Sequence, residues 1–188
     1  MFSWIIEKQA RILSVESGKF RVESHFWDAL KIGQSIAHDG ACMTIESFDN
    51  NSYTFFVMEE SLKKTNFRIK KPWDMFNIER CIQVGERIDG HFVSGHIDTT
   101  GKVSLIEKQD DGSLILWVLF DEALSKYTIE KWSITISGVS LTIVERKDWY
   151  LSVSLIPLTQ DITNLWALQL WSKVNLEFDM LGKYILNK

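Results

Sequence analysis

Apolar and polar residues alternate along several short stretches of the chain, which is the pattern of β-strands that bury one face. Residues 41–46 read Ala-Cys-Met-Thr-Ile-Glu, and residues 139–143 read Val-Ser-Leu-Thr-Ile. A turn dipeptide precedes each stretch, Asp39-Gly40 or Ser137-Gly138, and predicts a tight hairpin at both places. Further strands are expected at Lys19–Phe26, Ser52–Met58, Asp74–Arg80, Leu114–Phe120, Trp149–Ile156 and Lys173–Phe178. Short helical turns are expected at Glu60–Thr65, Glu122–Tyr127 and Thr159–Leu165.

The chain also repeats itself. Ser35–Ile45 and Ser133–Ile143 share five of eleven residues at an offset of 98, and Phe2–Glu7 aligns with Val93–Asp98 at an offset of 91. The first offset also pairs Asn77 with Asn175 and Glu79 with Glu177. We therefore expect two homologous domains, 1–87 and 88–178, followed by a short C-terminal helix over 179–188. Short strands in two units of about 90 residues predict small closed Greek-key β-barrels, because closure removes exposed sheet edges.

Small polar side chains occupy matched positions in the two halves. Cys42 and Thr44 lie on the face opposite the apolar residues of their strand, as do Ser140 and Thr142 in the second half. In one barrel alone these would be ordinary solvent-facing strand residues. Their duplication beside a glycine turn favours a protein that binds two copies of one molecule.

His96 lies among small residues in Ser94–Gly101, where a side chain can project into a cleft. A lone histidine is more often structural than catalytic. Spacing alone does not separate a general base from a hydrogen-bonded structural histidine at this position.

Charge and composition exclude several classes of protein. The net charge is −4, with 21 basic and 25 acidic residues spread along the chain, so no basic stripe indicates a nucleic-acid partner. No apolar run reaches the roughly 18–20 residues of a membrane span, and the N-terminus does not resemble a signal peptide, so a cytoplasmic protein is expected. Cys42 and Cys81 are the two cysteines, too few for a disulfide framework or a zinc site, and no metal is expected.

Seven segments carry a resemblance that covers nearly the whole chain in order. They are Met1-Phe2-x-x-Ile5, Gly33-x-Ser35-Ile36-Ala37-x-x-Gly40-x-Cys42-x-Thr44, Met58-x-Glu60-Ser61-Leu62-x-x-Thr65-Asn66, Gly90–Asp98, Gly138–Thr142, Leu155-Ile156-Pro157-x-Thr159 and Val174-Asn175-x-Glu177-x-Asp179. On these segments the chain resembles the riboflavin synthase family, which also contains the lumazine proteins. The resemblance implies an all-β fold: two homologous six-stranded Greek-key β-barrels in tandem plus a short C-terminal helix.

The resemblance also implies an activity. The enzymes of the family convert two molecules of 6,7-dimethyl-8-ribityllumazine into riboflavin and 5-amino-6-(D-ribitylamino)uracil by four-carbon transfer, without a metal or redox cofactor. A homotrimer is implied, in which each site holds two substrate molecules between the N-terminal barrel of one subunit and the C-terminal barrel of its neighbour. The resemblance also implies lumazine synthase as a further protein partner.

The family's site residues carry over position by position. Our hypothesis for catalysis is that His96 assists removal of the substrate methyl proton, while Ser35, Cys42 or a water acts on the partner ring. The remaining substrate-binding residues implied are Phe2, Thr44, Met58, Ser61, Lys131, Ser140, Thr142, Ile156, Thr159 and Asp179.

This chain also departs from the family's pattern. Trp4 stands where glycine is usual, and the tail after Asp179 is short. A non-enzymatic lumazine or flavin antenna of the same fold remains the closest alternative, although such proteins lose the histidine that is retained here as His96. A β-barrel binding module for nucleic acid or protein is the alternative from a different class.

Overall fold

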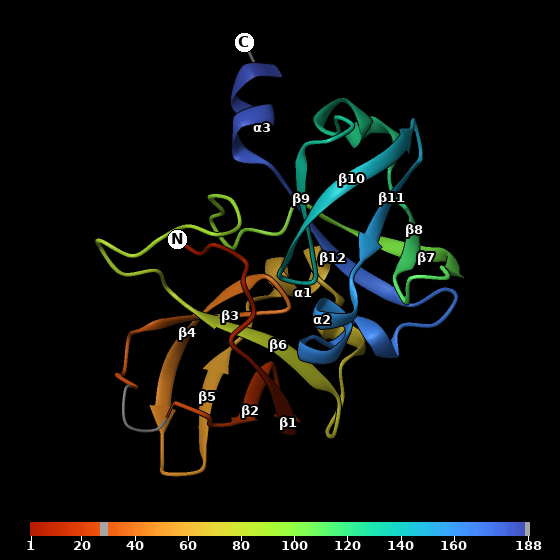
Figure 1. Ribbon diagram of the computed structural model, residues 1–188. Coiled ribbons are helices and arrows are strands. Elements are labelled where there is room, and N and C mark those ends of the chain that lie inside the picture. Colours follow the sequence, from red (N-terminus) through yellow and green to blue (C-terminus); the bar gives the residue numbers. More distant parts are fainter. Residues whose placement is uncertain (27–29, 187–188) are drawn as a thin grey trace.

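Strand-forming residues with a period of two fold into two closed antiparallel barrels (Figure 1). The computed structural model describes residues 1–26 and 30–186. The first barrel contains β1 (Lys8–Glu16), β2 (Lys19–Glu23), β3 (Ser35–His38), β4 (Ala41–Phe48), β5 (Ser52–Phe56), α1 (Glu59–Lys64), η1 (Asn66–Ile69) and β6 (Met75–Arg80). The second contains β7 (Thr99–Lys108), β8 (Leu114–Leu119), η2 (Glu122–Tyr127), β9 (Ser133–Ile136), β10 (Val139–Lys147), β11 (Tyr150–Leu155), α2 (Pro157–Ile162), η3 (Asn164–Ala167) and β12 (Lys173–Phe178), and α3 (Met180–Leu186) follows.

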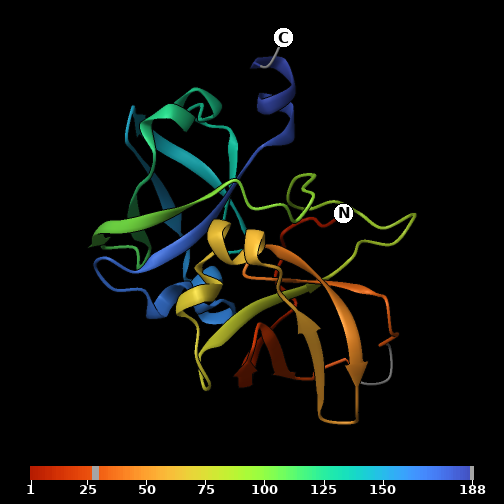
Figure 2. The same ribbon diagram turned by 180° about the vertical axis from the view of Figure 1, so that it is seen from behind.

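The two barrels have the same topology, which confirms the internal repeat. Strands of the first barrel neighbour one another in the order β1-β2-β5-β4-β3-β6, and those of the second in the order β7-β8-β11-β10-β9-β12. The barrels lie side by side, with α3 projecting from the second (Figures 1 and 2). None of the helices among the described residues is long and apolar enough to cross a membrane.

Most predicted strands are confirmed to within one or two residues, and the differences lie at element ends. Strand β2 ends at Glu23, three residues before the predicted Phe26, because its partner β5 begins at Ser52, directly opposite Glu23. The helical turn predicted at Thr159–Leu165 is instead two elements, α2 and η3, which Thr163 separates. The extended backbone of Thr163 caps η3, since its hydroxyl accepts a hydrogen bond from Leu165 N.

The alternation of β4 and β10 places apolar side chains inside the barrels as predicted. Met43 and Ile45 are buried, whereas Thr44 between them is exposed and Cys42 is half-buried. Strand β10 repeats this pattern with buried Leu141. The small polar residues of both strands therefore lie on the outer faces of the barrels.

The two cores use different side chains in the same topology. The first is aromatic: Phe20 stacks on Phe55 with ring centroids 5.5 Å apart, and Phe67 and Phe76 pack against both. The second is built mainly from Leu, Ile and Val. Large apolar side chains fill both interiors, so each barrel has a hydrophobic core of its own.

The barrels meet where their two predicted hairpin turns touch. Both turns are left-handed, with φ of 42° and 85° at Asp39 and Gly40, and 45° and 81° at Ser137 and Gly138. A Cβ at Gly40 would lie 2.9 Å from Gly138 N, and one at Gly138 would lie 2.7 Å from Gly40 N. The backbones pack directly against each other, and only glycine fits at these two positions.

A buried polar network surrounds these turns. Asn175 Nδ2 donates to Asp39 O, and Asn77 Nδ2 donates to Ser137 O, so each barrel caps the other's turn. The network is asymmetric, because the Asp39 carboxylate, 1% exposed, pairs with Lys70 Nζ at 2.7 Å and accepts from Asn164 Nδ2. Hydrogen bonds of this network therefore join the first barrel to the second.

We predict that Lys70→Leu lowers the free energy of unfolding by about 3–5 kcal/mol, because it leaves the Asp39 carboxylate buried without its cation. The second barrel supplies the matched control, since Ser137 and Leu168 stand at the repeat positions of Asp39 and Lys70. The double variant Asp39→Ser/Lys70→Leu copies that pair and regains at least half of the loss. Urea unfolding at pH 7 measures both values. Equal stability of the single and double variants would contradict this account.

A second prediction concerns His38, which is fully buried inside the first barrel. Its Nδ1 lies 3.1 Å from the Ile36 carbonyl, so Nδ1 carries the proton and Nε2 accepts from Tyr53 Oη at 2.7 Å. Burial lowers the pKa of His38 to about 3, despite the opposing bond to Ile36. The folded chain therefore binds fewer protons here than the unfolded chain does. Stability is lost as pH falls below the unfolded histidine pKa of about 6.5, by up to about 4 kcal/mol near pH 3.

The variant His38→Leu/Tyr53→Phe removes this titration together with its hydrogen-bond partner. Urea unfolding between pH 7 and pH 4 should show a smaller acid-side loss of stability in the variant than in the wild type. Other titrating groups, including Glu79, are common to both proteins and cancel in the difference. Parallel pH profiles would show that His38 does not titrate on unfolding.

Candidate active site

The predicted polar residues occupy the same register in both barrels. In the β3–β4 hairpin, Ser35 pairs with Thr44 and Ala37 with Cys42. In the β9–β10 hairpin, Ser133 pairs with Thr142 and Thr135 with Ser140. Thr44 and Thr142 are exposed, while Cys42 and Ser140 are half-buried. The structure thus presents two equivalent polar surfaces, one on each barrel.

Each of these strands is bonded to the entry segment of the other barrel. Cys42 N donates to Gly95 O at 2.9 Å, and Ser140 N donates to Trp4 O at 3.0 Å. A Cβ on Gly95 would lie 2.6 Å from Cys42 Cβ, so the segment approaches β4 closely. His96 follows Gly95 directly and is exposed. The backbone therefore places the His96 segment of the second barrel against the Cys42 strand of the first.

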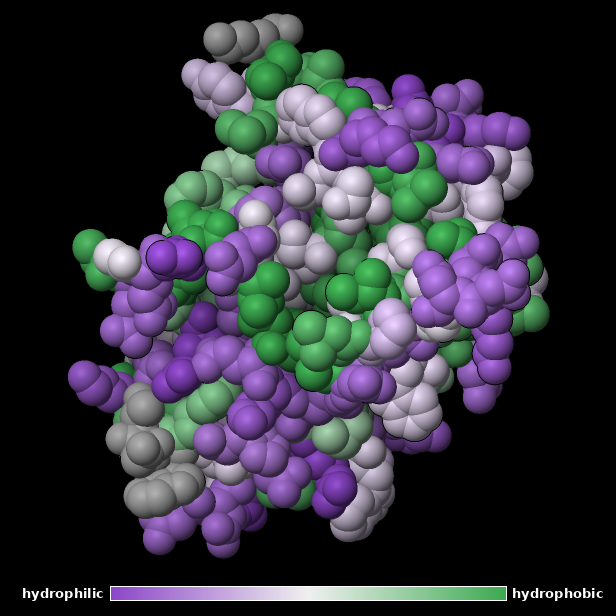
Figure 3. All heavy atoms as spheres, viewed as in Figure 1, coloured by the Kyte–Doolittle hydropathy of each residue, from purple (hydrophilic) through white to green (hydrophobic). Residues whose placement is uncertain are grey.

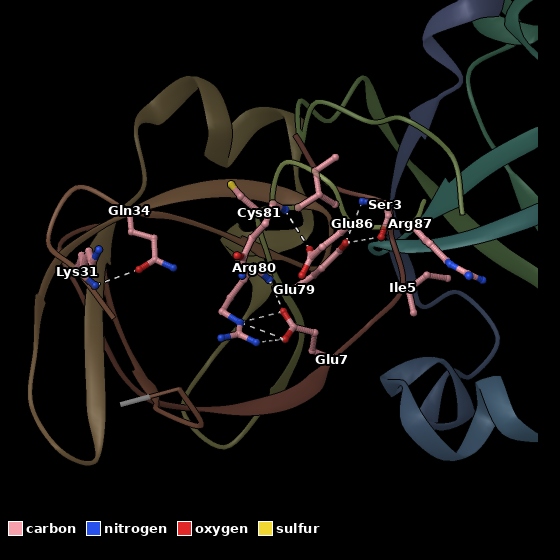
Figure 4. A pocket seen from close by; sticks show the side chains of 12 residues that line it. Ser3, Ile5, Glu7, Lys31, Gln34, Glu79, Arg80, Cys81, Glu86 and Arg87 are labelled. Carbon is pink, nitrogen blue, oxygen red and sulfur yellow. Dashed lines mark hydrogen bonds and ion pairs between the residues drawn. The ribbon is translucent and has the colours of Figure 1, made fainter. Parts of the chain in front are cut away.

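A cavity of about 530 Å³ opens beside the first barrel's entry segment (Figure 4). Its lining residues are Ser3, Ile5, Glu7, Lys31, Gln34, Glu79, Arg80, Cys81, Ile82, Gln83, Glu86 and Arg87. Two of them, Ile5 and Cys81, are the repeat counterparts of the predicted site residues His96 and Asp179. This cavity on the first barrel is therefore the repeat equivalent of the surface around His96 on the second barrel.

None of the predicted residues lines this cavity. One of its lining residues contacts a predicted residue, since the Cys81 thiol donates to Ser35 O at 3.6 Å. Phe2, predicted to line a pocket, is fully buried and stacks on Trp4 with ring centroids 5.0 Å apart and an interplanar angle of 5°. Trp4 is itself buried at a left-handed φ of 60°, a conformation that its counterpart Gly95 adopts without strain.

The remaining predicted residues lie at the ends of short elements. Met58 and Ile156 are the N-caps of α1 and α2 and are 63% and 54% exposed. Ser61 and Thr159 are half-buried in these helices, and Lys131 is exposed with a φ of 69°. Asp179 is half-buried and accepts a hydrogen bond from Leu181 N at the start of α3.

Two buried glutamates near the entry segments were missed as site residues. Glu79 Oε1 accepts from both the N–H and the hydroxyl of Ser3 at 2.9 Å, and Glu79 Oε2 accepts from Trp4 N at 2.9 Å. Glu177 accepts equivalently from Ser94 N at 3.0 Å, Ser94 Oγ at 2.6 Å and Gly95 N at 3.2 Å. Burial raises the pKa of Glu79 to about 7 and also raises the pKa of Glu177, although these donors favour the charged forms. The internal repeat pairs these two glutamates, but no sequence pattern indicates which backbone groups they bind.

His91 is a further residue that the site prediction omitted. Its Nδ1 lies 2.8 Å from Ser140 Oγ, and its Nε2 lies 3.4 Å from Thr135 Oγ1. Burial lowers the pKa of His91 while Asp179 raises it, and the net shift is downward. The ring is therefore uncharged at neutral pH, and it holds the Ser140 hydroxyl in place.

The chemistry available is acid–base and hydrogen bonding. Burial raises the pKa of the Cys42 thiol, with the bond to Ser35 opposing the shift, so the thiol form dominates at neutral pH. Among the described residues, no group of three His, Cys, Asp or Glu side chains is arranged to hold a metal ion.

Comparison with known proteins gives these features a context. The family described as Lumazine binding domain matches residues 4–81 and 94–179, one match for each barrel. The riboflavin synthase of Actinobacillus pleuropneumoniae is 39% identical over 98% of this chain and 88% of its own length. Those of Escherichia coli K12 and Bacillus subtilis 168 are 36% and 35% identical over 95% and 98% of this chain, and 87% and 88% of their own lengths.

Solved structures confirm the fold. LumP complexed with riboflavin has a TM-score of 0.87 at 20% identity, over 95% of this chain and 99% of that one. LumP complexed with 6,7-dimethyl-8-(1'-D-ribityl) lumazine has a TM-score of 0.83 at 21% identity with the same coverage. With both barrels matched and full-length similarity to the three enzymes, the chain belongs to the lumazine-binding domain family and, within it, to the riboflavin synthases.

Proposed function

We propose that this chain converts two molecules of 6,7-dimethyl-8-ribityllumazine into riboflavin and 5-amino-6-(D-ribitylamino)uracil. The observation that carries the proposal is the duplicated half-site: β3–β4 and β9–β10 offer the same polar register, each bonded to the other barrel. A reaction between two identical molecules needs two equivalent binding surfaces. The relatives that match at full length are riboflavin synthases, which supports the same conclusion.

The protein's main contribution is to hold the two rings against each other. Converting a bimolecular encounter into a local one can contribute up to ~7–11 kcal/mol. Thr44 and Thr142 are the exposed hydroxyls of the two half-sites, and Ser61 and Thr159 add a second matched pair. Met58 and Ile156 provide exposed apolar contact at the matched helix starts. These side chains bind the pyrimidine edges, the rings and the ribityl chains.

Proton transfer belongs to the second barrel's half-site. His96 and Asp179 stand there, whereas the first barrel has Ile5 and Cys81 at the same repeat positions. His96 removes the proton from the 7-methyl group of the lumazine, since an imidazole nitrogen can accept a proton as a general base. Ser35, Cys42 or a water acts at the partner ring as hydrogen-bond donor or nucleophile. Lys131 also belongs to the predicted set, whereas Phe2 is fully buried and stacks on Trp4.

The active assembly is a homotrimer in which neighbouring subunits each contribute one half-site. The support is α3, a short helix at the top of Figure 1, where Figure 3 shows apolar surface. Its Leu181 and Ile185 are 64% and 58% exposed. Apolar side chains on a projecting helix favour burial against another copy. We also propose that the boundary between the two domains lies between residues 87 and 88.

The direct test incubates purified protein with 6,7-dimethyl-8-ribityllumazine and follows riboflavin absorbance without added cofactor. The proposed function predicts steady turnover, and stoichiometric binding without turnover would indicate an antenna protein instead. His96→Gln should lower kcat by about 10²–10⁴ while substrate binding is retained. His25→Gln is the matched control, because His25 lies beside Glu23 on the first barrel's surface. Full activity of His96→Gln would refute the base assignment.

A second prediction follows from the raised pKa of the Cys42 thiol. Alkylation of Cys42 by iodoacetamide should reach half its maximal rate at a higher pH in the folded protein than in the urea-unfolded chain, where the thiol is solvated. Peptide mass spectrometry follows Cys42 in a Cys81→Ala background, so that only one thiol reacts. A half-maximal rate below pH 7.5 would instead indicate an activated thiolate nucleophile.

A further inference from the structure

The last strand of each barrel contains a buried glutamate, Glu79 or Glu177, and the two make equivalent hydrogen bonds. Each holds its barrel's entry segment by three hydrogen bonds, from a serine N–H, the same serine's hydroxyl and the next residue's N–H. Glu79 is 3% exposed and Glu177 is 2% exposed. A carboxylate that is buried this deeply and accepts three bonds fixes its donors firmly.

The segments held in this way reach across to the other barrel. Trp4 O accepts from Ser140 N, and Gly95 O accepts from Cys42 N. Each carboxylate is therefore two hydrogen bonds away from a site strand of the opposite barrel. A shift of Gly95 by a few tenths of an ångström would be passed to β4, because Gly95 and Cys42 are already in close contact.

The two segments differ in the residue that comes next. After Trp4 stands Ile5, and after Gly95 stands His96. One neighbouring contact is matched in both: Arg80 N donates to Glu7 at 2.7 Å in the first barrel, and Phe178 N donates to Asp98 at 2.8 Å in the second. The duplication has thus built two similar anchors, of which only one is followed by a proton-transfer residue.

We propose that Glu177 is a positioning residue for the reaction, which orients His96 and the Cys42 strand together by fixing Ser94 and Gly95. The inference rests on the proposed function, because it assigns His96 a part in proton transfer. Glu79 holds the Ser140 strand in the same way, but the segment that it fixes contains no proton-transfer residue. Glu79 is therefore the structural counterpart of Glu177 within the same chain.

The test compares Glu177→Gln with Glu79→Gln at pH 8, above the pKa of Glu79. A glutamine keeps one acceptor oxygen for the serine, and its amide N–H₂ then meets the next residue's N–H, donor against donor. Both variants should lose similar thermal stability, with melting temperatures within about 3 °C of each other. Glu177→Gln should lower kcat at least tenfold more than Glu79→Gln, with KM changed less than threefold, because a small misplacement of a reacting group is costly.

A double-mutant cycle separates positioning from mere folding. If Glu177 acts through His96, most of the kcat loss of Glu177→Gln disappears in a His96→Gln background. Additive effects, or equal kcat losses in Glu177→Gln and Glu79→Gln, overturn the inference. Wild-type protein without turnover overturns the proposed function first, and this separates the two failures.

A milder pair of variants keeps the test decisive if Glu177→Gln does not fold. Ser94→Ala removes only the Ser94 Oγ bond to Glu177, and Ser3→Ala removes the matched bond to Glu79. The expected order is the same, with Ser94→Ala lowering kcat more than Ser3→Ala. Equal values in this pair also overturn the inference.

Discussion

The backbone contact between the two hairpin turns is the constraint on which the rest of the structure depends. Gly40 and Gly138 approach each other so closely that neither position has room for a Cβ. Each turn joins the two strands that carry its barrel's polar residues, β3–β4 or β9–β10. Fixing the turns against each other therefore fixes the two polar hairpins relative to each other, and the surrounding asparagines complete the contact.

The internal repeat gives the two barrels equivalent polar hairpins, and sequence differences make the two halves unequal. Asp39 and Lys70 form a buried ion pair where the second barrel has Ser137 and Leu168. A buried ion pair contributes little net stability against an apolar replacement, so the two versions can coexist in one fold. The same divergence leaves Ile5 in the first half and His96 at the equivalent position in the second.

Trp4 differs from its repeat counterpart Gly95 in side chain but keeps the same backbone conformation and contacts. Its backbone repeats that of Gly95: a left-handed φ, an N–H bonded to a buried glutamate and a carbonyl bonded to the opposite site strand. Its indole stacks on Phe2 and is buried, with Nε1 unpartnered within the described part of the chain. The left-handed backbone costs roughly 1–2 kcal/mol for a residue other than glycine, which burial of the indole offsets.

The sequence by itself determined the strands, the duplication, the glycine turns and the family, because strand periodicity, turn chemistry and motif spacing are local properties. It also placed Cys42, Thr44, Ser140 and Thr142 on the outer faces, since side chains alternate along a strand. Only the tertiary structure showed that Glu79 and Glu177 anchor the entry segments, that His91 holds Ser140, and that Phe2 is sealed beneath Trp4. The hydrogen bonds among these contacts join residues between 49 and 83 positions apart. Long-range contacts of this kind depend on how the closed barrels pack, which no local pattern encodes.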